Sequence, residues 1–334
     1  MYGGGIWHTW YDRALGLAGR VVVKNEQGRL ENKIYKSSKA IAKISTIAIH
    51  LKSSNPLDIK KENDLKPIIA TELLRQLNCT EEDCSPLKKF LSQELQVNSE
   101  DIVDFDLCFA DWENAKIFGL YDEFISSPRL DNLYSVFCSL EAMFDSLQNS
   151  HEQNDCNLLA MFDHEEIGSE TYVGANSEFL KTVLQRICKS QNLQSEPLIR
   201  KSFFLSCDMA HSVHPNFSSN HQSNHKPQIN KGVVLKRNCN GRYTTDALSG
   251  AVVKLVAQNK DVDLQEFIVH CDSRCGSTIG PMVSSLLGCL SVDVGAPQLG
   301  MHSISETAGV LDFSYYKNFM QGFLEQDLKS LYPK

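Results

Sequence analysis

The sequence predicts an α/β fold in which a mixed, mainly parallel sheet is flanked by helices, with a β-rich region near the start of the chain. From about residue 101, apolar runs alternate with amphipathic helical patterns, as is typical of α/β proteins. Before that point, β-branched runs are separated by turns. With 334 residues and 42% hydrophobic content, the chain is long enough to form two domains.

The β-rich region begins with a predicted hairpin. Residues 19–25 and 29–36 flank a turn at Glu26, Gln27 and Gly28, and residues 43–51 supply a further β-branched run. Two short helices are predicted to follow. One covers residues 67–77, and the other begins at Ser85 as its N-cap, with Pro86 in the first helical position.

The second region holds the apolar runs and the clearest helices. Apolar positions at helical spacing predict one helix from Asp131 and another from about Ser177. The apolar runs are IVDFDLCFAD, NLLAMFD, SFFLSCD, EFIVHCD and CLSVDVG.

Composition excludes several classes of function. The net charge is -8, and no basic cluster is present, so we expect no nucleic-acid partner. The eleven cysteines are scattered, and the closest pairs, Cys79 with Cys84 and Cys271 with Cys275, lack the CxxC spacing of zinc ribbons and redox sites. Their odd number favours reduced thiols in the cytoplasm. No secretory signal is visible, and the longest nearly uncharged stretch, residues 275–296, predicts a buried helix and strand instead of a membrane span.

Acidic residues follow several of the apolar runs, where ligands collect in open α/β sheets. Glu165 and Glu166 follow the run at 157–163, and Gly168 would let the backbone turn sharply after them. One of two adjacent carboxylates can ligate a metal while the other takes a proton from water. The alternative is a solvated acidic loop.

Three further residues complete a candidate metal set. Asp208 ends the run SFFLSCD, Asp131 begins a predicted helix, and His302 lies in the loop QLGMHSISE. Each has an ordinary alternative, since Asp208 could stabilise a turn, Asp131 could be an N-cap and His302 could be a simple loop residue. Together with Glu166 they form a mixed oxygen and nitrogen set that suits zinc, with an aspartate able to bridge two ions.

Four neighbouring histidines offer a rival metal site, because HxxH and HxxxH spacings can place two imidazoles on one face of a helix. Pro215 and the intervening polar residues argue against such a helix, so we expect pocket-lining loop residues instead. The four are His211, His214, His221 and His225.

Seven motifs, in order from residue 2 to about residue 325, resemble the aspartyl aminopeptidase family of two-metal exopeptidases. Motifs of this length and order are highly specific. They are YGGGIWHTWYDRALGLAGRVVVK, YDEFISSPRLDNL, FDHEEIGSE, CDMAHSVHPNF, NHKPQINKGVVLK, CGSTIGP and GAPQLGMHSISE.

The resemblance implies a role for each candidate residue. Asp131 matches the aspartate that bridges two zinc ions, Glu165 the general base and Glu166 a ligand of one ion. Asp208 matches a ligand of the other ion, and His302 the last ligand.

Two substrate-binding residues are implied as well. Lys236 matches a lysine that faces the acidic side chain of the substrate, which gives the preference for Asp or Glu a charge rationale. His50 matches a histidine of the inserted domain that reaches an active site across a subunit contact.

The resemblance also implies an organisation. Residues 1–115 would form an inserted β-rich dimerization domain, and residues 116–334 a catalytic metallopeptidase domain of the zinc exopeptidase type. The family acts on peptides with an acidic N-terminus, uses two Zn²⁺ per subunit and forms dodecamer-like homo-oligomers.

One departure from the family pattern is expected to matter. The family carries a further metal-binding histidine in an AHxDSP-like segment before the glycine-rich opening, and this sequence has no such segment, so the N-terminal part of the catalytic domain is expected to be missing. Asp131 and Asp208 alone would hold the second zinc weakly. The alternative function is therefore a weak or inactive subunit with only an assembly role; a deacylase or carboxypeptidase activity on the same metal set is a further alternative.

Overall fold

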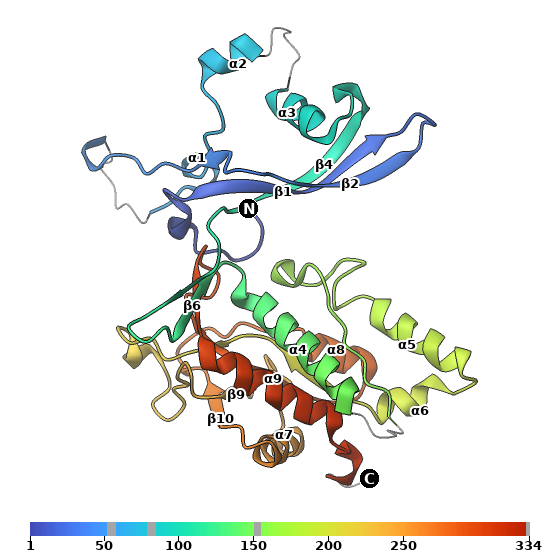
Figure 1. Cartoon of the computed structure of the whole chain (residues 1–334). Coiled ribbons are helices and arrows are strands. Elements are labelled where there is room, and N and C mark those ends of the chain that lie inside the picture. Colours follow the sequence, from blue (N-terminus) through green and yellow to red (C-terminus); the bar gives the residue numbers. More distant parts are fainter. Residues whose placement is uncertain (52–57, 79–84, 150–154, 332–334) are drawn as a thin grey trace. The chain divides into compact units, whose positions relative to one another are not determined.

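The chain divides into two compact units, which are described separately. A computed structural model describes residues 1–51, 58–78, 85–149 and 155–331 (Figure 1). The first unit contains Met1 and Ile6–Asn114, and the second contains Tyr2–Gly5 and Ala115–Lys334. The Cys79–Cys84 pair considered above lies outside the described residues.

The first unit is built on an antiparallel sheet. Its strands are β1 (Ala14–Lys24), β2 (Leu30–Lys36), β3 (Ala42–Lys43) and β4 (Ile102–Asp111). β1 pairs with each of the other three strands. The predicted hairpin is confirmed, because β1 and β2 are joined by a turn in which Gly28 has φ +77°, a conformation that glycine adopts without strain.

Short helices accompany this sheet. They are η1 (Trp7–Trp10), η2 (Ile49–Leu51), α1 (Lys61–Asp64), α2 (Glu72–Asn78), α3 (Pro86–Leu95) and η3 (Ser99–Asp101). α3 begins as predicted, since the Ser85 side chain accepts the N–H of Lys88 and Pro86 occupies the first turn. Leu91 of α3 is fully buried against Leu17 and Val21 of β1, so this helix supplies part of the first unit's core. The helix predicted at 67–77 begins later, at Glu72.

Two sequence predictions for this unit are wrong. The β-branched run at 43–51 contributes only Lys43 to β3 and then forms η2, with Ile47 and Ile49 exposed. The run IVDFDLCFAD is a strand, but it pairs antiparallel with β1 of the first unit instead of opening the α/β region. The β-propensity of the residues identifies an extended segment, whereas the available partner strand decides which sheet this segment joins.

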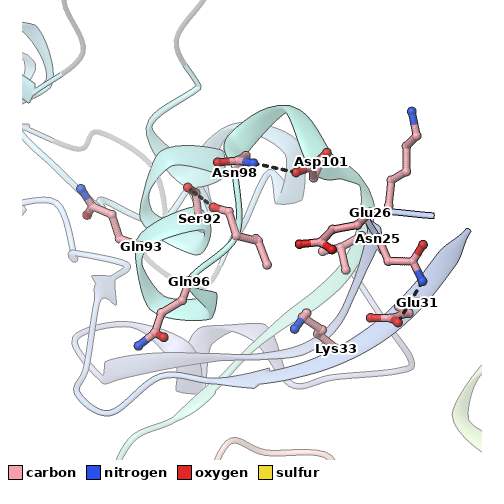
Figure 2. A pocket seen from close by; sticks show the side chains of 12 residues that line it. Asn25, Glu26, Glu31, Lys33, Ser92, Gln93, Gln96, Asn98 and Asp101 are labelled. Carbon is pink, nitrogen blue, oxygen red and sulfur yellow. Dashed lines mark hydrogen bonds between the residues drawn. The ribbon is translucent and has the colours of Figure 1, made fainter. Parts of the chain in front are cut away.

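A polar depression of about 510 Å³ lies between the β1–β2 hairpin and α3 (Figure 2). Its polar groups bond to one another: Asn25 donates to Glu31 over 3.0 Å, and Asn98 donates to Asp101 over 3.0 Å. These four side chains are half-buried or exposed and bond to one another, so they give no reason to place a ligand in the depression.

The second unit has the predicted α/β fold, with two mixed sheets. One has the order β10-β9-β11-β7, in which β10 with β9 and β11 with β7 are parallel, while β11 with β9 is antiparallel. The strands are β7 (Phe203–Cys207), β9 (Val233–Arg237), β10 (Leu264–Ile268) and β11 (Leu290–Gly295). The other sheet has the order β5-β6-β13-β12-β8. Its strands are β5 (Lys116–Phe118), β6 (Phe124–Ser127), β8 (Ala210–His211), β12 (Pro297–Leu299) and β13 (Glu306–Gly309).

Helices cover both faces of the first of these sheets. The second unit has a larger and a smaller hydrophobic cluster on this sheet. Phe203 and Leu205 of β7 belong to the larger cluster, which we call the larger core, and Phe204 between them belongs to the smaller one, because successive side chains of a strand point to opposite faces. The larger core contains residues of α4 (Leu130–Asn149), α7 (Ala247–Asn259) and α9 (Val310–Glu325), and α4 lies beside α9 (Figure 1). The smaller cluster contains residues of α5 (Phe179–Ser190) and α8 (Gly280–Leu287). The remaining short helices are η4 (Glu165–Ile167), α6 (Ser195–Arg200), η5 (Ser218–Asn220) and η6 (Leu328–Ser330).

The predicted helices and strands of this unit are confirmed with one exception. The run NLLAMFD at 157–163 is not a strand in the structure, and its Leu158 and Met161 are 41% and 46% exposed. The stretch 275–296 forms α8 and β11, as predicted. Within the described ranges, no helix is both long enough and apolar enough to span a membrane.

Candidate metal centre

Three side chains from distant parts of the sequence meet in the second unit. Asp131 lies in the first turn of α4, Glu166 in η4 and His302 in the loop between β12 and β13. His302 Nε2 lies 3.3 Å from Asp131 Oδ2 and 3.4 Å from Glu166 Oε2. Their potential ligand atoms all lie within 4.8 Å of one another, which is compatible with one shared metal ion.

The loop that carries Glu165 and Glu166 is a tight turn. His164 before it and Gly168 after it both have positive φ, of 62° and 104°. The Gly168 N–H donates to Glu165 O over 2.9 Å, and no atom lies within 4 Å of the position that a Gly168 Cβ would occupy. Glycine is therefore required here by backbone conformation and not by crowding, in agreement with the turn predicted at this position.

A hydrogen bond at the nitrogen that faces away from the two carboxylates orients the imidazole of His302. Its Nδ1 lies 3.2 Å from the carbonyl oxygen of Gly4, so a proton on Nδ1 can be donated there while Nε2 faces the two carboxylates. The hydrogen bond with Asp131, followed by the charge of Glu166, raises the His302 pKa to about 9. Without a metal, a proton therefore occupies the position between these groups at neutral pH.

Asp208 follows β7 directly, at the end of a strand as predicted, and is 21% exposed. Loss of hydration raises its pKa to about 6, and a hydrogen bond with Asp131 contributes to the increase, while the charge of Lys236 opposes it. Lys236 Nζ lies 3.5 Å from Asp208 Oδ2 and donates to Met209 O over 2.9 Å. Asp208 and Asp131 are thus neighbours, and Lys236 lies beside them.

Glu165 lies among the same acidic groups. Loss of hydration, followed by the charges of Asp208, Glu166 and Asp131, raises its pKa to about 7. A carboxyl group with a pKa near the working pH is suited to accept and return a proton.

Glu306 is a buried acid that the sequence did not single out. It is the first residue of β13 and is 2% exposed. Its Oε2 accepts the N–H of Asp131 over 2.9 Å, and its Oε1 accepts the N–H of His302 over 2.7 Å. Burial raises its pKa to about 7 against the effect of these two bonds. The only signal in the sequence is its position four residues after His302 in the motif GMHSISE.

The structure does not support the rival histidine site. Residues 212–217 are not helical, and the backbone N–H of His214 donates to His221 Nε2 over 3.1 Å. Among the described residues, the group at metal-binding distance is Asp131, Glu166 and His302. Loss of hydration and then the charge of Lys236 lower the pKa of His211 to about 4, so its ring is neutral at pH 7.

His50 belongs to the first unit. It lies in η2 and its side chain is exposed. The other six predicted site residues belong to the second unit.

The donor set fits zinc. Two carboxylates and one imidazole are ligands that zinc accepts, and His302 is held from behind by the Gly4 carbonyl at its ring and the Glu306 carboxylate at its backbone N–H. Loss of hydration, and after it the neighbouring carboxyl groups, raise the pKa values of Glu165 and Asp208, and a divalent cation would stabilise the charged forms of these groups.

In the second unit, the carboxylate–imidazole centre lies at the ends of strands and helices of an α/β fold. This combination is typical of metallohydrolases. Residues 1–324 match the family described as "Aminopeptidase I zinc metalloprotease (M18)", and the chain belongs to this family.

Individual relatives agree with this assignment. Aspartyl aminopeptidase 1 of Schizosaccharomyces pombe is 41% identical, and the match covers 98% of this chain and 74% of the relative. A cryo-EM structure of the complex of Ape4 and Nbr1 contains a chain that is 39% identical, with a TM-score of 0.93, and the match covers 100% of this chain and 67% of that one. The structure of an mApe1 dodecamer from S. cerevisiae is 26% identical, with a TM-score of 0.81, and the match covers 99% of this chain and 73% of that one.

Proposed function

We propose that this metallo-aminopeptidase hydrolyses the first peptide bond of peptides that begin with Asp or Glu. The observation that carries the proposal is the position of Glu165 among Asp131, Glu166 and Asp208, with its pKa raised to about 7. The aspartyl aminopeptidases among the relatives support the acidic specificity. Because base and candidate ligands are brought together, catalysis is favoured over a role in assembly alone.

Asp131, Glu166 and His302 would hold one zinc ion, and Asp131 with Asp208 would contribute to a second. When bound, zinc acts as a Lewis acid that polarises the carbonyl group and makes water more acidic.

Glu165 is the general base in this proposal. As the water oxygen attacks the carbonyl carbon, the Glu165 carboxylate takes a proton from that water. The same proton then passes to the amine nitrogen as the carbon–nitrogen bond breaks. The products are the free acidic amino acid and the shortened peptide.

Lys236 is proposed to bind the acidic side chain of the substrate. The Lys236 side chain is 2% exposed, and its ammonium group lies next to Asp208 and 5.3 Å from the centre of the Tyr243 ring. A cation held in such surroundings interacts more strongly with a carboxylate than one in water does.

His50 is proposed to contribute to substrate binding across a subunit contact in a homo-oligomer, with residues 1–115 as the dimerization domain. The related mApe1 dodecamer supports an oligomeric assembly. A cytoplasmic location is also proposed, and the nine cysteines among the described residues, all of them free thiols, support it.

The test of the proposed function is Glu165→Gln. We expect kcat on an Asp-anilide substrate to fall by about 10²- to 10⁴-fold, while the zinc content of the purified protein stays unchanged. Glu170→Gln is the matched control, because Glu170 lies exposed in the same loop, and this variant should retain wild-type kcat. Wild-type turnover by Glu165→Gln would refute the assignment of the base.

A further inference from the structure

Glu306 joins two segments of the second unit that are far apart in sequence. Asp131 is 175 positions from Glu306, yet its backbone N–H lies 2.9 Å from Glu306 Oε2. The other oxygen, Oε1, accepts the N–H of His302 over 2.7 Å. One buried carboxylate therefore sets the distance between the backbones of two proposed metal ligands.

The conformation of His302 increases the need for such a contact. His302 has φ +68°, in the left-handed region that residues other than glycine avoid, because their Cβ crowds the backbone there. A strained residue keeps this conformation only where its surroundings hold it. The bond from its N–H to Glu306 is one such restraint, and the bond from its ring to Gly4 is another.

We propose that Glu306 is a positioning residue, which presents Asp131 and His302 to the metal by holding their backbone N–H groups. The proposal rests on the metal centre of the proposed function. Glu306 touches the backbone of the ligands and not the reacting atoms, so its effect should appear first in metal affinity.

Both oxygens of Glu306 are required for this role. Glutamine has the same length but accepts at only one oxygen, and its amide N–H₂ group would face the N–H of Asp131 or of His302. Aspartate keeps both oxygens but is shorter by one methylene group, so it cannot reach both donors in the same way. Each substitution therefore releases one ligand backbone while leaving the ligand side chains in place.

The chain offers a matched control in Asp312. This buried carboxylate is 1% exposed and accepts the backbone N–H groups of Asn230 over 2.7 Å and of Gly232 over 3.3 Å. Neither donor is a proposed ligand. Asp312→Asn therefore changes a buried carboxylate that, like Glu306, accepts two backbone N–H groups, but it leaves the proposed metal ligands untouched.

The experiment measures zinc affinity by competition with a chromogenic chelator, starting from zinc-free full-length protein. We expect Glu306→Gln and Glu306→Asp to bind zinc about 10- to 100-fold more weakly than the wild type, and Asp312→Asn to bind within about threefold of it. We also expect kcat of the Glu306 variants to recover substantially at saturating zinc. Urea unfolding of the zinc-free proteins accompanies each titration, so that loss of folding is separated from loss of affinity.

The remaining outcomes also decide the question. Wild-type zinc affinity in Glu306→Gln would overturn the proposal, as would an equal loss of affinity in Asp312→Asn, which would indicate a general effect of destabilisation. If Glu306→Gln does not fold, Glu306→Asp decides. Failure of both Glu306 variants to fold without zinc would give Glu306 a folding role and overturn the positioning role. Failure of the wild type itself to bind zinc would refute the proposed metal centre, and is thereby distinguished from failure of the role of Glu306.

Discussion

Lys236 Nζ lies 3.5 Å from the carboxylate of Asp208, and Lys236 is only 2% exposed. Removing one partner of a buried ion pair leaves the other charge uncompensated. We therefore expect Lys236→Met to lower the free energy of unfolding of the zinc-free protein by roughly 3 kcal/mol, the low end for buried pairs, because Asp208 is 21% exposed. Urea unfolding at pH 7 measures this change.

Lys254→Met is the control for this pair. Lys254 lies 2.6 Å from Glu266 but is 54% exposed, so solvent screens the interaction. The expected loss is below about 1 kcal/mol. Equal losses in the two variants would mean that the Lys236–Asp208 pair behaves as a surface pair, and that burial of Lys236 adds nothing to it.

Gly3 supports the metal centre by leaving room for Glu166. A Cβ on Gly3 would lie 3.1 Å from the Cβ of Glu166, closer than ordinary packing allows. We expect Gly3→Ala to displace Glu166 and to weaken zinc binding about tenfold. Competition with a chelator measures the affinity.

Gly241→Ala separates crowding from backbone strain. Gly3 and Gly241 have nearly the same φ, +67° and +69°, so alanine costs each a similar strain of about 1 kcal/mol. No atom lies within 4 Å of the position of a Cβ on Gly241. Gly241→Ala should keep wild-type zinc affinity, and a loss equal to that of Gly3→Ala would show that strain, not contact with Glu166, is responsible.

Local patterns predicted most of the helices and strands, but not their partners. The α4 helix was predicted from apolar spacing, yet its buried apolar residues are Leu130, Tyr134, Cys138 and Ala142, while the apolar residues Leu133, Phe137, Phe144 and Leu147 are more than half exposed. The helix is apolar on more than one face, so periodicity identified it without identifying the face that packs. The run at 157–163 has the composition of a strand but no place in the described sheets, because a strand also needs a neighbour.

The centre itself was predictable only in part. The acids after strands and the ordered motifs identified Asp131, Glu166 and His302, which the structure brings within 4.8 Å of one another at their potential ligand atoms. The supporting contacts were not predictable. Glu306 bonds to Asp131, and the Gly4 carbonyl to His302, across long stretches of sequence that no local spacing reports.

We expect the buried carboxyl group of Asp312 to make the free energy of unfolding depend on pH, and the variant Asp312→Asn to lose this dependence. Burial raises the pKa of Asp312 from 3.8 to about 6, against the effect of the hydrogen bonds that it accepts from backbone N–H groups. Because the pKa in the folded state is higher than in the unfolded state, the folded protein binds more protons between these values. The contribution of this group to stability is therefore fully present below about pH 3.8 and is lost as the pH rises through about 6.

We expect the free energy of unfolding of the wild type, relative to Asp312→Asn, to fall between pH 4.5 and pH 7 by up to about 1.4 kcal/mol per pH unit. Urea unfolding of both proteins across this range measures the difference. A difference that stays constant with pH would mean that Asp312 has the same pKa in the folded and unfolded chain, and a difference that grows with pH would reverse the sign of the shift.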